Sequence, residues 1–465
     1  MKNTATQSDS NIAIRLAERI ISITAADITA EAMDWSTIAV LDTIGVSLAG
    51  ASEPCVKLLL DVPGVATAPG PALILGTARR TSMLDAALVN GTAAHALDYD
   101  DVCGMSGAHP SAPMVPSLLA LAEAHNLSGK DLLISVMVGI DIQNRIGRCV
   151  NVFHYVKGWH PTSTLGIFGT VAASARLLKL DLQQTTMALG IAASCAAGIK
   201  ANFGTMTKPL HAGHSARGGL LAALLAQKGY TSNSAAFEHT QGFLEVFNGP
   251  GKYAVENIFT DWSTPINVEP SLGIKQFPCC GSTHPAVTMM LALVKEEGVT
   301  PADAVKIEIL AQRNRLPHTN NPHPLNGMQA RFSIQYAVAR ALVDGVVRLE
   351  HFEGDAHLNP HVRSVMQKII TCEHPDMPPE LNQFGSEVIV TTRDGRRLAR
   401  RIDHMMSRSP ENPMRHNELK EKFVDCAKRA FSVEKSKVLF DQLIGLASVS
   451  DFNQVSRSME VQNNV

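Results

Sequence analysis

The chain has 465 residues, which at about 150 residues per domain predicts two large or three smaller domains with an extensive core. Lys and Arg total 41 and Asp and Glu total 43, a near balance that disfavours nucleic acid and anionic membranes as main partners. Charged residues are 18% of the chain and apolar residues 45%, so we expect a large interior or a surface hidden in an oligomer, and not disorder.

The first 270 residues or so are predicted to be helical, because apolar residues recur there at helical spacing. The later helices are rich in Ala and Gly, and such small residues let helix axes approach closely. We therefore expect these helices to form the buried centre. The predicted helices span residues 12–23, 35–48, 82–96, 112–124, 130–148, 164–178, 183–197 and 212–228.

The pattern changes after Pro270. Apolar and polar residues alternate over Val305–Ala311, which predicts a half-buried strand. Segments 387–392 and 397–402 flank an Asp-Gly pair and predict a β-hairpin. Helices are predicted at 285–297, 331–343 and 360–370, then a proline-containing linker at 407–414 and helices at 417–430 and 436–446.

These elements predict a mostly α protein with two domains. Residues 1–270 and 407–465 form a large all-helical domain that is discontinuous in sequence, and residues 271–406 form a smaller α+β domain. The N-terminus is polar, and the most apolar run, residues 187–199, is too short to span a bilayer. We expect a cytoplasmic protein with reduced thiols and no membrane partner.

Several familiar motifs are absent from the sequence. It contains no G-x-G-x-x-G, P-loop, H-E-x-x-H or G-x-S-x-G motif, which disfavours NAD, ATP, zinc-protease and common serine-hydrolase sites. The eight cysteines include no C-x-x-C pair, so a zinc ribbon or a thioredoxin-like site is not expected.

A first polar cluster follows the helix that ends near residue 96. Asp98, Asp100 and Asp101 precede a Gly- and Pro-framed loop that presents His109. Aspartates alone are typical of an exposed acidic turn or a Mg²⁺ site, and we favour the acidic turn. Together with His109 they predict a proton-transfer site, with Asp98 orienting or charging the imidazole.

Two further clusters lie in the helical region. His160 stands before a Ser- and Thr-rich helix start, which suits either a carboxylate site or a capped loop with a surface histidine. Lys208 lies between two apolar helices, and we favour a base or carboxylate anchor over a solvated loop lysine. His211 and His214 beside it are interpreted as structural.

The smaller domain opens with a cluster around two adjacent cysteines. Cys280 precedes a predicted helix, a position that can lower a thiol pKa, although an inert cysteine is the commoner outcome. Arg331 and Tyr336 are expected on one helix, about one turn apart, with a core tyrosine as the alternative for Tyr336.

Taken together, these clusters resemble the MmgE/PrpD family in order and over nearly the whole chain. The resemblance implies a helical domain with a smaller α+β lid domain, a site between the two, a homodimer, and no metal or organic cofactor. It further implies a small polycarboxylate substrate, with Asp98, His109, His160, Lys208, Lys275 and Tyr336 as site residues. The matching residues are Leu41-Asp42-Thr43-Ile44-Gly45-Val46, His95, Asp98, Asp100, Asp101, His109-Pro110-Ser111, Gly158, His160-Pro161, Lys208-Pro209-Leu210-His211, Gly213, Lys275, Pro278, Thr283-His284, Phe332-Ser333 and Gln335-Tyr336.

Two departures from the pattern of the family's dehydratases and decarboxylases influence the expected reaction. Val102 stands where those members have a threonine, and Cys280 stands where the decarboxylase has a histidine. Both departures disfavour these two reactions, and by overall likeness the chain most resembles the iminodisuccinate epimerase branch of the family. The resemblance therefore implies a cofactor-independent epimerase of iminodisuccinate or a similar amino-dicarboxylate. The alternatives are a lyase that resembles 2-methylcitrate dehydratase or cis-aconitate decarboxylase, and a catalytically silent binding protein.

An epimerase needs a base on one face of the reacting carbon and an acid on the other. Lys208 and His109 are expected in these roles, with Cys280 and Tyr336 as rivals for the second face. The charge that develops on the substrate carboxylate must be stabilised by fixed donors, for which His160, Lys275 and Arg331 are the candidates.

Overall fold

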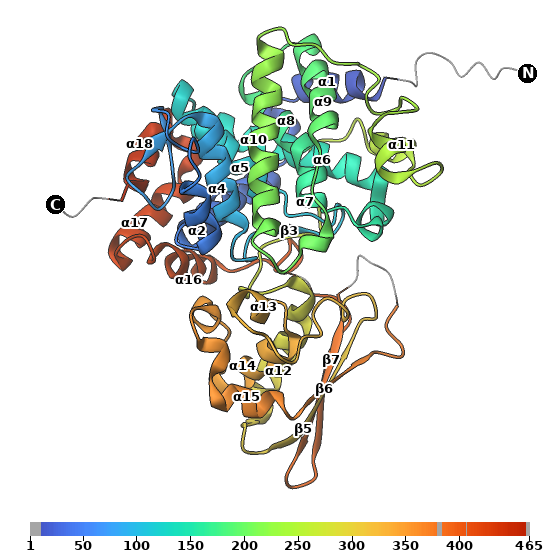
Figure 1. Ribbon diagram of the computed structural model, residues 1–465, viewed down its shortest axis with the longest axis vertical. Coiled ribbons are helices and arrows are strands. Elements are labelled where there is room, and N and C mark those ends of the chain that lie inside the picture. The colour runs from blue at the N-terminus through green and yellow to red at the C-terminus, as the bar shows by residue number, and fades with distance from the viewer. Residues whose placement is uncertain (1–10, 379–383, 406, 462–465) are drawn as a thin grey trace, which may run out of the picture. The chain divides into compact units, whose positions relative to one another are not determined.

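The computed structural model describes residues 11–378, 384–405 and 407–461. The protein is mostly helical, with 55% helix and 9% strand. The chain divides into two compact units (Figure 1). The first comprises residues 1–96, 100–272 and 415–465, and the second comprises residues 97–99 and 273–414.

The first unit is built almost entirely from helices. Within the described residues no single helix is long and apolar enough to cross a membrane. Helices α2 and α3 reach that length and apolar character only when taken together, and they are bent by 78° at the break between them. The helices are α1 (Ile12–Ser22), α2 (Ala30–Gly50), α3 (Pro54–Leu60), α4 (Met83–His95), α5 (Ser111–His125), α6 (Gly129–Lys157), α7 (Pro161–Thr164), α8 (Gly166–Leu177), α9 (Leu182–Cys195), α10 (Thr207–Gln227), α11 (Phe243–Asn248), α16 (His416–Ala427), α17 (Val433–Ile444) and α18 (Asn453–Ser456).

Short strands and 3₁₀ turns complete this unit. Strands β1 (Ala72–Leu73) and β2 (Arg80–Thr81) pair antiparallel, and β3 (Val102–Cys103) lies in the loop before α5. The 3₁₀ turns span Ala25–Asp27, Lys200–Asn202, Val255–Phe259, Leu446–Ser448 and Arg457–Met459.

Helices α4 and α10 pack closely side by side in the first unit (Figure 1). A Cβ atom at Gly213 would lie 2.2 Å from Thr92 Oγ1 and 2.3 Å from the Leu88 carbonyl oxygen, so only glycine fits there. Gly91 faces Gly213 in the same way, at 2.9 Å from its Cα. The expected close packing of small-residue helices is thus confirmed. It brings the end of α4 to the first turn of α10.

Helix α10 begins at Thr207, five residues before the predicted start at Ala212. Lys208 and His211 therefore lie on a helix and not in a loop, as the sequence analysis had placed them. Pro209 does not prevent this earlier start. Proline is tolerated in the first turn, where its missing N–H has no helical partner.

A buried ion pair joins the C-terminal helices to the N-terminal part of the first unit. Lys422 Nζ on α16 lies 2.6 Å from Asp42 Oδ1 on α2, and the two side chains are 4% and 2% exposed. Helix α16 packs on α2 along the same face. This contact explains why the first unit is discontinuous in sequence.

The second unit contains a four-stranded sheet with the order β6-β5-β7-β8. Strand β5 pairs parallel with β6 and antiparallel with β7, and β7 continues into β8 through the predicted Asp394-Gly395 turn. Ile307 and Ile309 of β5 are buried, as the alternating pattern predicts. The strands are β5 (Ala304–Ala311), β6 (Ile369–Glu373), β7 (Ser386–Thr392) and β8 (Arg397–Ile402), and β4 (Leu272–Gly273) lies where the chain enters this unit.

The helices of the second unit differ from the prediction at two places. They are α12 (His284–Glu297), α13 (Gly327–Arg331), α14 (Ile334–Asp344) and α15 (Pro360–Met366), with 3₁₀ turns at Gly281–Thr283, Leu349–Phe352 and Ala356–Leu358. The helix predicted at 331–343 begins at Ile334, because the Ser333 side chain accepts the Tyr336 N–H as an N-cap. The helix predicted at 360–370 ends at Met366, and the strand β6 that follows was missed.

The linker predicted at 407–414 belongs to the second unit. Arg408 forms an antiparallel bridge with Ile274, with backbone N···O distances of 2.9 and 3.0 Å. The prediction relied on Pro410 and Pro413, which lie beyond the bridge and do not prevent it.

We expect Lys422→Met to destabilise the protein strongly, because it leaves the Asp42 carboxylate buried without its cation. Such a loss costs about 3–5 kcal/mol of unfolding free energy. Lys420→Met is the matched control on the same helix, since its partner Asp441 is 62% exposed and such pairs contribute at most about 1 kcal/mol. Urea denaturation measures both. Equal losses in the two variants would contradict an anchoring role for the buried pair.

Candidate active site

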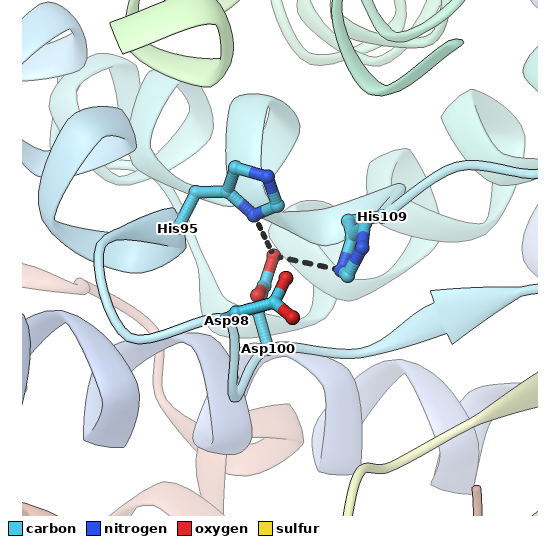
Figure 2. Close-up of side chains that lie close together, drawn as sticks. All are labelled: His95, Asp98, Asp100 and His109. Carbon is cyan, nitrogen blue, oxygen red and sulfur yellow. Dashed lines mark hydrogen bonds and ion pairs between the residues drawn. The ribbon is translucent and has the colours of Figure 1, made fainter. Parts of the chain in front are cut away.

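A buried carboxylate bridges two histidines in the first unit (Figure 2). Asp100 Oδ2 lies 2.7 Å from His95 Nδ1 and 3.2 Å from His109 Nδ1. His95 is the last residue of α4, and His109 lies two residues before α5. The His95 and Asp100 side chains are fully buried, whereas His109 is 14% exposed. Of the two imidazoles, His109 is therefore the one that solvent reaches.

The loop between α4 and α5 is held by hydrogen bonds at several points. Cys103 and Ala108 exchange both backbone hydrogen bonds, with Gly107 in the left-handed region at φ 62°. Ser111 donates to Asp101 from its N–H at 3.2 Å and from its hydroxyl at 2.5 Å. The His109 N–H donates to Thr162 Oγ1 at 3.1 Å. These bonds fix His109 on the Asp100 carboxylate.

Further histidines and one lysine extend this cluster within the first unit. The His160 ring stacks on His95 at 5.5 Å and meets Phe203 edge-on at 4.9 Å. His160 Nδ1 lies 3.1 Å from His211 Nδ1. Lys208 is 6% exposed, and its Nζ lies 5.3 Å from the centre of the Phe203 ring. The structure thus brings together three residues predicted from sequence: His109, His160 and Lys208.

Burial keeps the inner histidines neutral. It lowers the pKa of His95 to about 3, that of His211 to about 4, and that of His160 well below its usual range. The charge of Lys208 lowers all three pKa values further. The site therefore combines neutral imidazoles with one buried ammonium group.

The Asp100 carboxylate, in contrast to the buried histidines, is kept in its charged form. Burial alone would raise the pKa of Asp100, but the charges and hydrogen bonds of His109 and His95 lower it well below its usual range. Its neighbour Asp101 lacks such partners, and burial raises the pKa of Asp101 to about 8. Two adjacent aspartates thus differ: Asp100 is ionised and Asp101 is protonated near neutral pH.

Asp98 and Lys275 pair within the second unit. Lys275 Nζ lies 3.1 Å from Asp98 Oδ2 and donates to the Asp98 carbonyl at 2.8 Å. Lys275 is 1% exposed, and Asp98 has a φ of 51°, a conformation that aspartate adopts more readily than most residues. Both residues were predicted as site residues, but their pairing was not.

Cys280 and Arg331 are also neighbours in the second unit, since the Cys280 N–H donates to the Arg331 carbonyl at 2.9 Å. Cys280 is half-buried, and Arg331 is 2% exposed. The adjacent Cys279 is buried beside Thr283 Oγ1 at 3.1 Å, and burial raises the pKa of its thiol to about 12. Cys280 is therefore the accessible thiol of the two.

Tyr336 lies in the hydrophobic core of the second unit and is fully buried. Its hydroxyl donates to the His351 carbonyl and accepts from Arg340 Nε at 2.9 Å. The phenol is thus engaged by residues of the core. The structure favours the core-tyrosine alternative, and we leave Tyr336 out of the proposed chemistry.

Three members of the first-unit cluster were given other roles from the sequence. Asp100 was placed in the predicted proton-transfer site, but Asp98 was expected to orient His109; His95 was named only as part of a motif, and His211 was interpreted as structural. The spacing of His95 and Asp100 gives little signal, because His95 closes a helix and Asp100 lies in an irregular loop. Close packing of α4 on α10 brings His95 near Lys208, and that packing is a tertiary property.

Comparison with known protein families matches two consecutive domains of one family to this chain. Residues 14–256 match the MmgE/PrpD N-terminal domain, and residues 277–443 match the MmgE/PrpD C-terminal domain. The chain belongs to the MmgE/PrpD family. These two matches cover most of the chain and confirm the family that the sequence motifs indicated.

Several known proteins are similar to this chain over most of its length. Human cis-aconitate decarboxylase is 30% identical over 422 residues, which cover 89% of this chain and 87% of that protein. Cis-aconitate decarboxylase of Aspergillus terreus is 24% identical, covering 92% and 91%. 2-Methylcitrate dehydratase of Salmonella typhimurium is 26% identical, covering 79% and 80%. These names describe lyases, and none of the three is an epimerase.

We expect the protein to lose stability as the pH falls from 6.5 towards 4. His211 has a folded pKa of about 4, below its unfolded value of about 6.5, so the unfolded chain binds the extra proton within this window. One such group contributes a slope of about 1.4 kcal/mol per pH unit. His211→Gln should remove that contribution near pH 5.

Urea denaturation at a series of pH values measures the effect. His361→Gln is the control, since His361 is exposed on α15 in the second unit. A slope unchanged by His211→Gln would show that His211 is protonated in the folded protein.

Proposed function

We propose that this protein is a lyase that acts on a small, citrate-like polycarboxylate. The observation that carries the proposal is the His109–Asp100 pair beside Lys208 and neutral imidazoles, in a chain whose relatives include a decarboxylase and a dehydratase. This favours the lyase alternative of the sequence analysis over the epimerase expected there.

The site supplies what such a reaction requires. Breaking a bond next to a carboxylate builds negative charge on its oxygens, and fixed donors in a dry environment stabilise that charge. Lys208 offers an ammonium group within the first unit, and His160 offers a neutral imidazole beside it. We assign substrate carboxylate binding to this pair.

The reaction also needs an acid. Decarboxylation returns a proton to the carbon that loses CO₂, whereas dehydration protonates the departing hydroxyl as a base removes the neighbouring proton. His109 fits the acid role, because the ionised Asp100 carboxylate 3.2 Å away stabilises its protonated ring. Asp100 is a positioning residue in this scheme, since it acts through His109.

A second candidate is the epimerase of an amino-dicarboxylate. Val102 and Cys280 favour it, since they replace groups typical of the family's dehydratases and decarboxylases. Lys208 and His109 would then transfer protons on opposite faces of the carbon α to a carboxylate, with Cys280 as a rival for one face. The two candidates differ in whether an unsaturated acid or CO₂ is released.

Incubation with a panel of polycarboxylates in D₂O separates these candidates. A lyase releases CO₂ from cis-aconitate or forms an unsaturated acid from 2-methylcitrate or a related hydroxy acid. An epimerase incorporates deuterium at the α carbon without forming a new double bond. Failure of every polycarboxylate to react or exchange would contradict both proposals and favour a binding protein.

We expect His109→Asn to reduce kcat by about 10²–10⁴-fold, the contribution typical of acid–base groups. Lys208→Met should reduce kcat by about 10²–10³-fold, because it removes a fixed donor that stabilises the charge developing on the substrate carboxylate. His214→Gln on α10 is the control and should leave turnover unchanged. Steady-state kinetics with the substrate identified above provides the measurement. In an epimerase the two variants should each keep deuterium exchange for a different enantiomer. Near-normal turnover in both would show that the site assignment is wrong.

Removal of metal ions by EDTA should leave activity intact, because the proposed steps use side chains alone. The assay compares kcat before and after dialysis against EDTA. Loss of activity that Mg²⁺ restores would instead make Asp98, Asp100 and Asp101 candidate ligands.

The homodimer implied by the family resemblance remains a prediction, which light scattering tests.

A further inference from the structure

We propose that His95, Asp100 and His109 form a binding site for Zn²⁺ or a similar transition-metal ion, and that the bound ion inhibits the enzyme. The binding part of this proposal concerns the three side chains alone. The inhibitory part rests on the proposed function, in which His109 transfers a proton.

The geometry of the three groups is close to that of a tetrahedral zinc site. The ligand atoms of His95, Asp100 and His109 all lie within 4.8 Å of one another, and Asp100 Oδ2 lies 2.7 and 3.2 Å from the two Nδ1 atoms. Ligands bound at about 2.0–2.1 Å to a tetrahedral ion are about 3.4 Å apart. A small outward movement of the side chains around Asp100 therefore makes room for an ion (Figure 2).

A second observation also points to a cation. Asp100 Oδ1 is buried and has no hydrogen-bond partner among residues 11–378, 384–405 and 407–461. The whole Asp100 side chain is buried. A buried carboxylate oxygen without a partner is costly, and a divalent cation beside Asp100 offsets that cost.

The types of ligand atom in the cluster indicate which metal ions it would bind. Imidazole nitrogen suits Zn²⁺, Cu²⁺ and Ni²⁺, whereas Mg²⁺ prefers carboxylate and water oxygens in octahedral geometry. Two imidazoles and one carboxylate also leave a fourth position open for water, as in zinc sites with three protein ligands. The cluster thus favours zinc over the Mg²⁺ considered for the aspartates from sequence.

Binding of the ion would remove the proton-transfer group. The ion takes the Nδ1 lone pair of His109, so that the ring can no longer hold a proton on both nitrogens and act as an acid towards a substrate. His109 is partly exposed, which gives the ion a route to the cluster. Zinc is therefore expected to act as a reversible inhibitor that a chelator removes.

The test titrates Zn²⁺ into the EDTA-dialysed full-length protein in competition with a fluorescent zinc indicator. We expect one ion per chain, no displacement by Mg²⁺, and at least about 10-fold weaker binding in Asp100→Asn and in His95→Gln. Asp101→Asn is the matched control, because this neighbouring carboxyl group lies outside the cluster and asparagine can still accept the Ser111 N–H. It should keep the zinc affinity of the parent protein.

Binding of Co²⁺ provides a second measurement, because its absorption spectrum shows whether any of the eight cysteines binds the ion. A tetrahedral Co²⁺ spectrum without thiolate charge-transfer absorption supports the proposal. Circular dichroism checks that each variant is folded. Absence of saturable binding, unchanged affinity in Asp100→Asn and His95→Gln, or a thiolate band would overturn it. These outcomes need no substrate, so they remain distinct from failure of the lyase proposal.

Discussion

The shared oxygen of Asp100 is the constraint on which the rest of the first-unit cluster depends. One buried carboxylate with two imidazoles holds a negative charge in a region that otherwise contains neutral histidines and the ammonium group of Lys208. A carboxylate buried at this depth without such partners would take up a proton. Asp101, the next residue in the chain, does so, because burial raises its pKa to about 8. The contrast between adjacent aspartates shows that partner geometry, more than depth, decides which group carries charge.

This arrangement also gives the histidines different roles. His95 and His160 are buried and neutral, so they serve as fixed dipoles and hydrogen-bonding groups. His109 alone among the three has appreciable exposure and a direct carboxylate partner. The same cluster that positions an acid therefore has the donor set of a zinc site, and proton transfer and metal binding compete for one nitrogen.

Much of the fold could be predicted from the sequence, because periodicity reports which residues are buried. The long helices and the hairpin at Asp394-Gly395 are local features with strong patterns, and the structure confirms them. Strand β6 was missed, since its parallel pairing with β5 is a contact between distant segments. The start of α10 was also missed, and Pro209 is compatible with it because it lies in the first turn of the helix.

The site was predictable in its residue types but not in its pairings. Motifs identified Asp98, His109, Lys208 and Lys275, yet the ion pair of Asp98 with Lys275 joins residues 177 positions apart. Asp100 became central only through the loop geometry that places His109 against it. Tyr336 shows that a motif residue can also belong to the hydrophobic core, the alternative that the sequence left open.

The buried contact between α2 and α16 has a consequence for biosynthesis. Asp42 emerges from the ribosome long before Lys422, and the whole second unit is made between them. Until Lys422 is synthesised, the first unit contains an acidic side chain whose cation does not yet exist. Completion of the first unit must therefore await the synthesis of α16, whereas the second unit, apart from the short segment 97–99, is continuous and can fold earlier.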